Sequence, residues 1–79
     1  MKDKIRQVFK ELFKINPEDF REDLDMNSVA GWDSLNHLNL VISLEELFGI
    51  SFTTEEVIQM TSVKAIIETL RGKNEREII

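Results

Sequence analysis

Residues 31–49 read Gly-Trp-Asp-Ser-Leu-Asn-His-Leu-Asn-Leu-Val-Ile-Ser-Leu-Glu-Glu-Leu-Phe-Gly, and this stretch decides the fold. Asp33 is a favourable N-cap, because its side-chain oxygen can accept hydrogen bonds from amides two or three residues later. Ser34 then lies in the first turn of a predicted helix, and Gly49 ends that helix. The free amides and the positive dipole at this helix end favour an anion beside Ser34.

Most of the surface of this predicted helix is apolar. At about 100° per residue, its polar side chains form one narrow stripe. They are Asn36, Asn39, Ser43 and Glu46. Apolar side chains fill most of the remainder: Leu38, Leu40, Val41, Leu44, Leu47 and Phe48. We therefore expect the other elements to surround this helix nearly completely, with Ser34 as the exposed exception.

Length and composition predict one small domain over residues 1–79. The chain has no cysteine, so apolar packing and not disulfides must hold it together. A net charge of −5, from 15 acidic and 10 basic side chains, argues against nucleic acid as a partner. No apolar run approaches the ~20 residues that cross a bilayer. We expect a soluble, cytoplasmic monomer without a membrane span.

Two segments flank the central helix on its amino-terminal side. Residues 2–14 carry the apolar spacing of an amphipathic helix, which Pro17 ends. Its apolar residues are Ile5, Val8, Phe9, Leu12 and Phe13. Residues 16–32 then form a long connection without regular periodicity, with a single possible turn from Pro17. We expect its apolar side chains to pin it over the core. They are Phe20, Leu24, Met26 and Val29.

Two further helices follow the central one. Thr53 and Glu56 have the spacing of a capping box, which predicts a short helix to about residue 59. Thr61 or Ser62 caps a last helix, which Gly72 ends, and residues 73–79 form a frayed tail. Its apolar stripe consists of Val63, Ile66, Ile67 and Leu70. The fold class is all-α: an antiparallel four-helix bundle of three main helices and one short helix, with a long first loop.

The residues give little support for an enzyme. Ser34 and His37 could share a helix face as nucleophile and base, but the chain has no second histidine and no nucleophile elbow. The acidic residues between 18 and 25 lack the spacing of a calcium loop, so we expect no metal site. The sequence therefore favours a domain on which other proteins act.

A series of motifs along the chain resembles an acyl carrier protein over nearly its whole length. The motifs are Gly31-Trp32-Asp33-Ser34-Leu35, Leu38, Leu40-Val41, Leu44-Glu45-Glu46, Phe48-Gly49, Phe52 and Thr61-Ser62-Val63. The resemblance implies that Ser34 is the attachment point for phosphopantetheine, with Asp33 as the helix cap beside it. A separate, magnesium-using phosphopantetheinyl transferase would supply the arm from coenzyme A. The arm's thiol would hold an acyl group as a thioester for acyl-transferring and acyl-processing enzymes.

The same resemblance implies a partner surface on the central helix. In the family, basic patches of partner enzymes grip acidic residues there, flanked by apolar side chains. The corresponding residues here are Leu35, Asn36, Asn39, Ile42 and Glu46. Few of these are acidic, which predicts partner binding that depends weakly on salt and a role outside housekeeping fatty-acid synthesis. The alternative for Leu35 and Ile42 is that both are core residues.

The resemblance also implies an acyl cavity bordered by His37, Leu38, Val41 and Leu44. A histidine there would narrow the cavity, and we hypothesise a short, polar or otherwise specialised acyl group in a lipid, polyketide or secondary-metabolite pathway. The alternative is that His37 lies at a solvated rim without a role. For Trp32 we expect a packing anchor whose indole nitrogen bonds a carbonyl, in preference to a partner contact.

Two other functions stay open at this stage. A carrier of amino acids, of the peptidyl or alanyl type, would share the serine and the helical bundle. An unmodified helical interaction domain would share the bundle alone.

Overall fold

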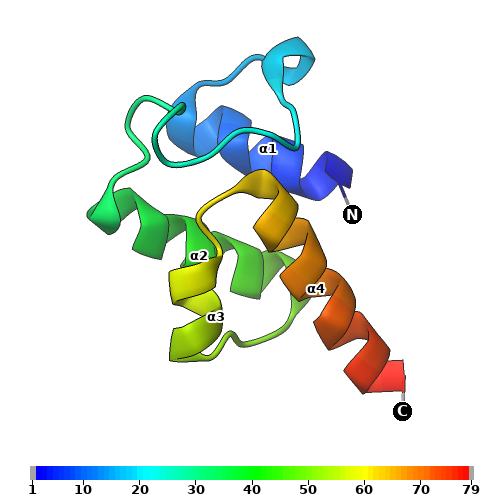
Figure 1. Cartoon of the computed structure of the whole chain (residues 1–79). Coiled ribbons are helices and arrows are strands. Elements are labelled where there is room, and N and C mark those ends of the chain that lie inside the picture. The colour runs from blue at the N-terminus through cyan, green and yellow to red at the C-terminus, as the bar shows by residue number, and fades with distance from the viewer. Residues whose placement is uncertain (1, 79) are drawn as a thin grey trace.

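Four α-helices and one short 3-10 turn make up the computed structural model, which describes residues 2–78 and the side chains of residues 2–73 (Figure 1). The elements are α1 (Lys2–Phe13), the 3-10 turn η1 (Pro17–Asp19), α2 (Ser34–Phe48), α3 (Thr54–Gln59) and α4 (Val63–Ile78). Residues 2–78 contain no β-strand, only an isolated bridge between Asp25 and Ser62. The prediction of an all-α bundle is confirmed. Within the described residues, no helix has the length and apolar character that a bilayer span requires.

Helix α1 packs the predicted apolar face against the core. Its buried side chains are Ile5, Val8, Phe9 and Phe13. The helix ends at Phe13, earlier than the expected end before Pro17, because Lys14 adopts a left-handed conformation with φ of 60°. Pro17 instead opens η1, where its missing amide donor costs nothing.

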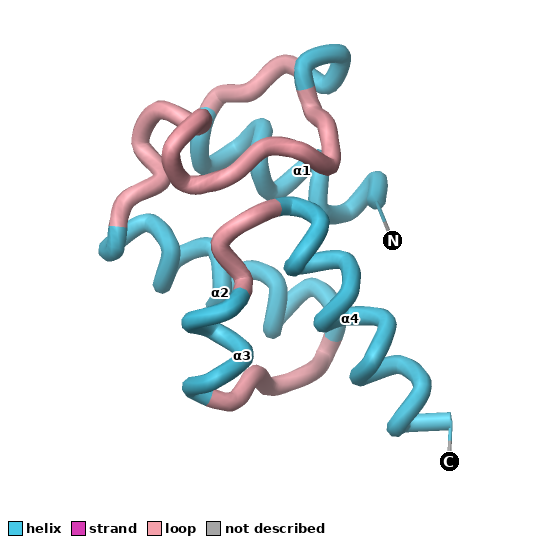
Figure 2. Tube along the Cα trace, in the orientation of Figure 1, coloured by secondary structure: helices cyan, strands magenta, loops and turns pink. Residues whose placement is uncertain are grey.

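The long connection from residue 16 to residue 32 lies over α1 (Figure 2). Leu24 and Val29 are buried, while Phe20 and Met26 are partly buried against the core, as predicted. Backbone hydrogen bonds also join this connection to the beginning of α4. The Val63 amide donates to the Leu24 carbonyl oxygen at 2.9 Å. The connection is therefore a packed part of the bundle despite its irregular backbone.

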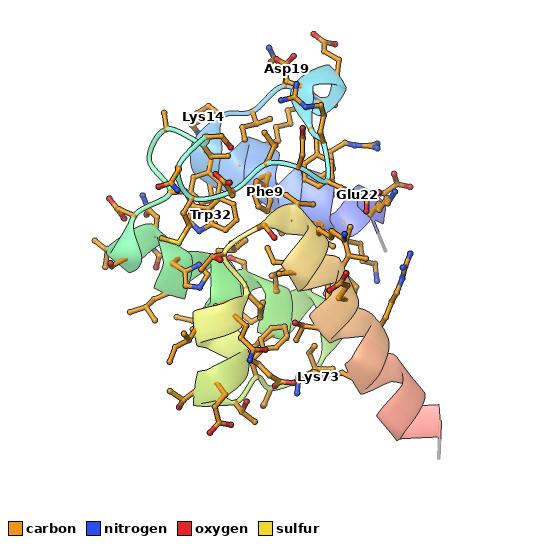
Figure 3. The ribbon with its side chains drawn as sticks, viewed as in Figure 1. Phe9, Lys14, Asp19, Glu22, Trp32 and Lys73 are labelled. Carbon is orange, nitrogen blue, oxygen red and sulfur yellow. The ribbon has the colours of Figure 1, made fainter. Side chains whose placement is uncertain are left out.

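Aromatic side chains fix the last part of this connection in the interior. Trp32 lies beside Phe9, as Figure 3 shows, with ring centroids 5.2 Å apart in an edge-to-face arrangement. Phe9 also contacts Phe13 and Phe20, at centroid distances of 5.2 and 5.5 Å. Such pairs are favourable beyond the area that they bury. They anchor the turn before Ser34 to α1.

Helix α4 follows the predicted cap and apolar stripe, but its predicted end is wrong. The Ser62 hydroxyl accepts from the Ala65 amide at 3.0 Å. The stripe of Val63, Ile66, Ile67 and Leu70 is buried. Gly72 does not end the helix, which continues to Ile78, because a glycine weakens a helix interior by only about 1 kcal/mol and does not forbid it. The expected fraying of residues 73–79 concerns mainly side chains outside the described ones and stays a prediction.

The expectation that other elements nearly surround α2 is wrong. One side of the helix is buried, through His37, Leu40, Val41 and Leu44. Four large apolar side chains on the remainder are exposed: Leu35, Leu38, Ile42 and Leu47. A chain of 79 residues has too few other elements to cover a 15-residue helix on every side. The apolar side chains of α2 therefore form an exposed surface as well as part of the core.

The capping box of α3 is present and is joined to α4. The Thr53 side chain accepts from the Glu56 amide, and the Glu56 carboxylate accepts from the Thr53 amide at 2.8 Å. Lys73 of α4 forms an ion pair with the same carboxylate at 2.8 Å and lies over the Phe52 ring. The hydrogen bond from Lys73, and then that from the Thr53 amide, hold the pKa of Glu56 below its ordinary value.

We expect Glu56→Ala to lower the free energy of unfolding by about 1–2 kcal/mol, because it removes the carboxylate from both the helix cap and the ion pair. Glu56→Gln is the matched control, since its amide oxygen can still accept from the Thr53 amide. Because the folded pKa of Glu56 is lowered, its contribution is present above the unfolded pKa and is lost as the pH falls through the folded pKa. Denaturant unfolding across acidic pH should show this loss in the wild type and a smaller one in Glu56→Gln; equal pH profiles would contradict it.

Candidate functional site

Ser34 is the first residue of α2 and is exposed. Asp33 before it has extended backbone angles, and its carboxylate accepts from the Asn36 amide at 2.8 Å, so the predicted N-cap is confirmed. Gly31 has φ of 86°, a left-handed conformation in which a residue with a side chain is strained. The local sequence thus turns the chain sharply and leaves the Ser34 side chain outside the bundle.

A second polar contact closes the same turn. The Asn36 side-chain amide donates to the Gly31 carbonyl oxygen at 2.8 Å, and the Asn39 amide donates to the Asn36 side-chain oxygen at 3.2 Å. Asn36 is consequently half-buried, whereas Asn39 and Glu46 are exposed. Among the polar residues predicted to contact partners, Asn36 thus also stabilises the turn before α2.

Apolar side chains beside Ser34 face solvent. Leu35 is 70% exposed and Ile42 is 52% exposed, so the alternative that both are core residues is wrong. Leu38 is 54% exposed, and its position three residues after Leu35 and four before Ile42 places all three on one helix face. On the neighbouring α3, Ile58 is 67% exposed.

The residues predicted to border an acyl cavity do not all lie together. His37, Val41 and Leu44 are on the buried side of α2. The predicted interior position of Leu38 is wrong, because its side chain lies on the exposed face with Leu35. An advance of about 100° per residue carries Leu38 away from the face of His37. The cavity itself stays a prediction.

His37 is 8% exposed, which contradicts the alternative of a solvated rim position. The indole nitrogen of Trp32 donates to its Nδ1 at 3.0 Å, and its Nε2 lies 2.8 Å from the Val57 carbonyl oxygen in α3. Because an indole nitrogen can only donate, Nδ1 accepts, and we assign the ring proton to Nε2, which donates to Val57. Trp32 is thus a packing anchor as expected, but its partner is an imidazole nitrogen and not a carbonyl.

These contacts decide what Ser34 and His37 can do chemically. Both imidazole nitrogens are engaged, by Trp32 and by Val57, so His37 does not serve Ser34 as a general base. The Ser34 hydroxyl is exposed at the amino end of α2. Sequence reasoning missed the link from His37 to Val57, because no motif signals a contact between residues 20 positions apart.

Comparison with known proteins gives consistent findings. A family model described as "Phosphopantetheine attachment site" matches residues 3–70. The chain is 34% identical over 65 residues to the acyl carrier protein of Wolinella succinogenes, covering 82% of this chain and 86% of that protein. It is 28% identical over 75 residues to the acyl carrier protein of Campylobacter hominis, covering 95% of each. A non-reducing polyketide synthase of Monascus ruber is 26% identical over 68 residues, which are 86% of this chain and 2% of that protein.

Proposed function

This chain belongs to the acyl carrier protein family, whose members bear a phosphopantetheine attachment site, and we propose that Ser34 is the residue that carries the arm in this protein. The observation that carries the proposal is the exposed Ser34 side chain at the capped start of α2. Proteins of this family are carriers and not catalysts.

The residues around Ser34 fit a phosphodiester. Negative charge at a helix amino terminus is stabilised by roughly 0.3–1 kcal/mol at an exposed position. Asp33 occupies the Asn36 amide, so the arm projects outward instead of folding back onto the helix end. The neighbouring side chain of Leu35 is exposed and offers an apolar contact to the arm or to a partner enzyme.

The proposed modification transfers the phosphopantetheine group of coenzyme A to the Ser34 oxygen. The Ser34 oxygen forms a bond to the phosphorus that bears the pantetheine of coenzyme A. The bond from that phosphorus to the bridging pyrophosphate oxygen breaks, and the adenosine bisphosphate leaves. The hydroxyl proton passes to a base on a phosphopantetheinyl transferase, because His37 is engaged elsewhere. When bound, the arm holds an acyl group as a thioester and raises its effective concentration at a partner enzyme.

Incubation with coenzyme A and a promiscuous transferase should add the mass of one phosphopantetheine to the wild type, with the modified peptide containing Ser34. Ser34→Ala should gain no mass, because no other hydroxyl heads α2. Intact-protein and peptide mass spectrometry measure both. An unchanged wild-type mass would favour an unmodified helical interaction domain, whereas an aminoacyl cargo on protein from the native host would favour the carrier of amino acids.

The proposed partner surface is more apolar than acidic. It consists of Leu35, Asn36, Asn39, Ile42 and Glu46. The exposed fractions of Leu35 and Ile42 support apolar contacts with partner enzymes, and Glu46 is the one acid in this set. Since few charges are present for steering, apolar burial supplies most of the proposed affinity.

We expect the affinity for the transferase to fall only weakly as salt concentration rises, because few ion pairs are screened. Asn39→Glu adds one charge to the exposed stripe and should make the dependence steeper. Binding measured by calorimetry over a salt series compares the two proteins. A wild-type dependence already as steep as that of Asn39→Glu would contradict an apolar surface.

For the cargo we propose a short, polar or otherwise specialised acyl group, in a lipid, polyketide or secondary-metabolite pathway. Support comes from the hydrogen bond between His37 and the Val57 carbonyl oxygen, which joins α2 to α3. A chain inserted between those helices would have to separate the two groups and leave both unpaired. Both ring nitrogens of His37 are already paired, so the polarity of the imidazole does not by itself exclude an acyl chain. The hydrogen bond that holds α2 against α3 is what opposes insertion of the chain between them.

Loading the arm with a medium-chain acyl group should leave the His37 chemical shifts and the thermal midpoint of unfolding unchanged, since the chain stays outside the bundle. The acetylated carrier is the matched reference, because it differs only in chain length. Nuclear magnetic resonance spectra and thermal unfolding provide the two readouts. Large shifts of the His37 ring signals together with a raised midpoint would show an inserted chain.

A further inference from the structure

Two consecutive hydrogen bonds, one buried and one partly buried, join the turn before Ser34 to α3 through His37. Trp32, two residues before Ser34, donates from its indole nitrogen to His37 Nδ1 at 3.0 Å. His37 Nε2 donates to the Val57 carbonyl oxygen at 2.8 Å. The indole and imidazole rings also stack, with centroids 6.1 Å apart and planes inclined by 25°. We call these three residues the His37 link.

An exposed apolar side chain follows each end of the bond between His37 and Val57. Leu38 directly follows His37, and Ile58 directly follows Val57. Leu38 is 54% exposed and Ile58 is 67% exposed. The hydrogen bond between residues 37 and 57 therefore joins two helices that each present an exposed apolar side chain. In Figure 1, α3 lies beside the middle part of α2, and the two helices are joined by the bond from His37 to Val57.

We propose that His37 is a positioning residue for the modification of Ser34: through the His37 link it holds α2, α3 and the Trp32 turn in the arrangement that a phosphopantetheinyl transferase binds. This inference rests on the proposed function of Ser34. The partner is the transferase because any enzyme that reaches the Ser34 hydroxyl must cover the adjoining start of α2. His37 acts through other residues and touches neither the arm nor the reacting atoms.

The link requires the neutral imidazole. Protonation places a hydrogen on Nδ1, which then faces the indole N–H, and two donors 3.0 Å apart cannot bond each other. The bond from Trp32 is lost, and buried donors are left without an acceptor. Acid therefore opposes the link, and neutral or alkaline solution preserves it.

The charged groups on the neighbouring elements are engaged or exposed. Asp33 accepts from the Asn36 amide, and Glu56 binds Lys73 and the Thr53 amide. Glu55 of α3 is exposed, as are the α1 residues Lys10 and Lys14. On the α1 side, the Phe9 and Phe13 rings contact Trp32. The groups named here therefore have other hydrogen-bond partners, lie in solvent or are uncharged rings.

Two substitutions separate positioning from mere packing. His37→Gln keeps a neutral side chain whose amide can donate to the Val57 carbonyl oxygen at every pH. His37→Leu keeps apolar volume and removes both hydrogen bonds. Transfer from coenzyme A is measured with each carrier at about pH 8 and about pH 5, on either side of the range in which histidine usually titrates. Circular dichroism first establishes that each variant is folded under the assay conditions.

At about pH 8, His37→Leu should raise the KM for the carrier about five- to tenfold with little change in kcat, because both hydrogen bonds that hold the arrangement are lost. His37→Gln should recover most of this loss. At about pH 5, the wild-type KM should rise relative to that of His37→Gln. The ratio of the wild-type KM to the His37→Gln KM cancels the pH dependence of the transferase itself, because the same enzyme acts on both carriers.

A second readout needs no enzyme. Trp32 is the one tryptophan of the chain, so the protein has one indole N–H signal. That signal should move on acidification in the wild type and stay in place in His37→Gln. A pH-independent KM ratio, or a His37→Leu carrier with the wild-type KM, would overturn the positioning role while leaving Ser34 modification intact. Failure of every carrier to be modified would instead overturn the proposed function.

Discussion

The contact between Phe9 of α1 and Trp32 of the turn before α2 is the interaction on which the site depends. Phe9 is fully buried, and its ring lies 5.2 Å from that of Trp32. A chain without cysteine has to hold a 17-residue connection by noncovalent contacts, and these rings supply part of them beside the backbone hydrogen bonds to α4. Because Trp32 is two residues before Ser34, the contact also sets where α2 begins. The position of Ser34 is thus a consequence of core packing as well as of the helix cap.

The division of α2 into a buried and an exposed side follows from the size of the domain. Leu40 and Leu44 are fully buried, whereas Leu35 and Ile42 face solvent on the same helix. A small domain cannot cover every face of a long apolar helix, so some apolar surface remains for contacts outside the chain. The polar stripe adds little charge to this surface, since Asn36 and Asn39 are neutral and Glu46 is its one acid. The exposed start of α2 therefore combines apolar side chains with the polar Ser34, the proposed attachment residue.

Local signals in the sequence predicted the helices well. Asp33, Gly49 and the pair of Thr53 and Glu56 act within one turn of the chain, and the structure confirms each of them. Gly72 was misleading because a glycine ends a helix only where the following backbone turns away, and α4 continues instead. The burial of α2 was overestimated because periodicity identifies apolar faces but does not count the elements available to cover them.

Membership in the acyl carrier protein family and the capped start of α2 at Ser34 were determined by the sequence alone, because both depend on residues close together in the chain. The hydrogen bonds of His37 were decided only by the tertiary structure. Its partner Val57 lies 20 residues away, and neither residue type specifies the other. The exposed face that contains Leu38 was decided in the same way, since exposure depends on where the remaining helices pack. Contacts of this kind arise from the joint packing of distant segments, which no local pattern records.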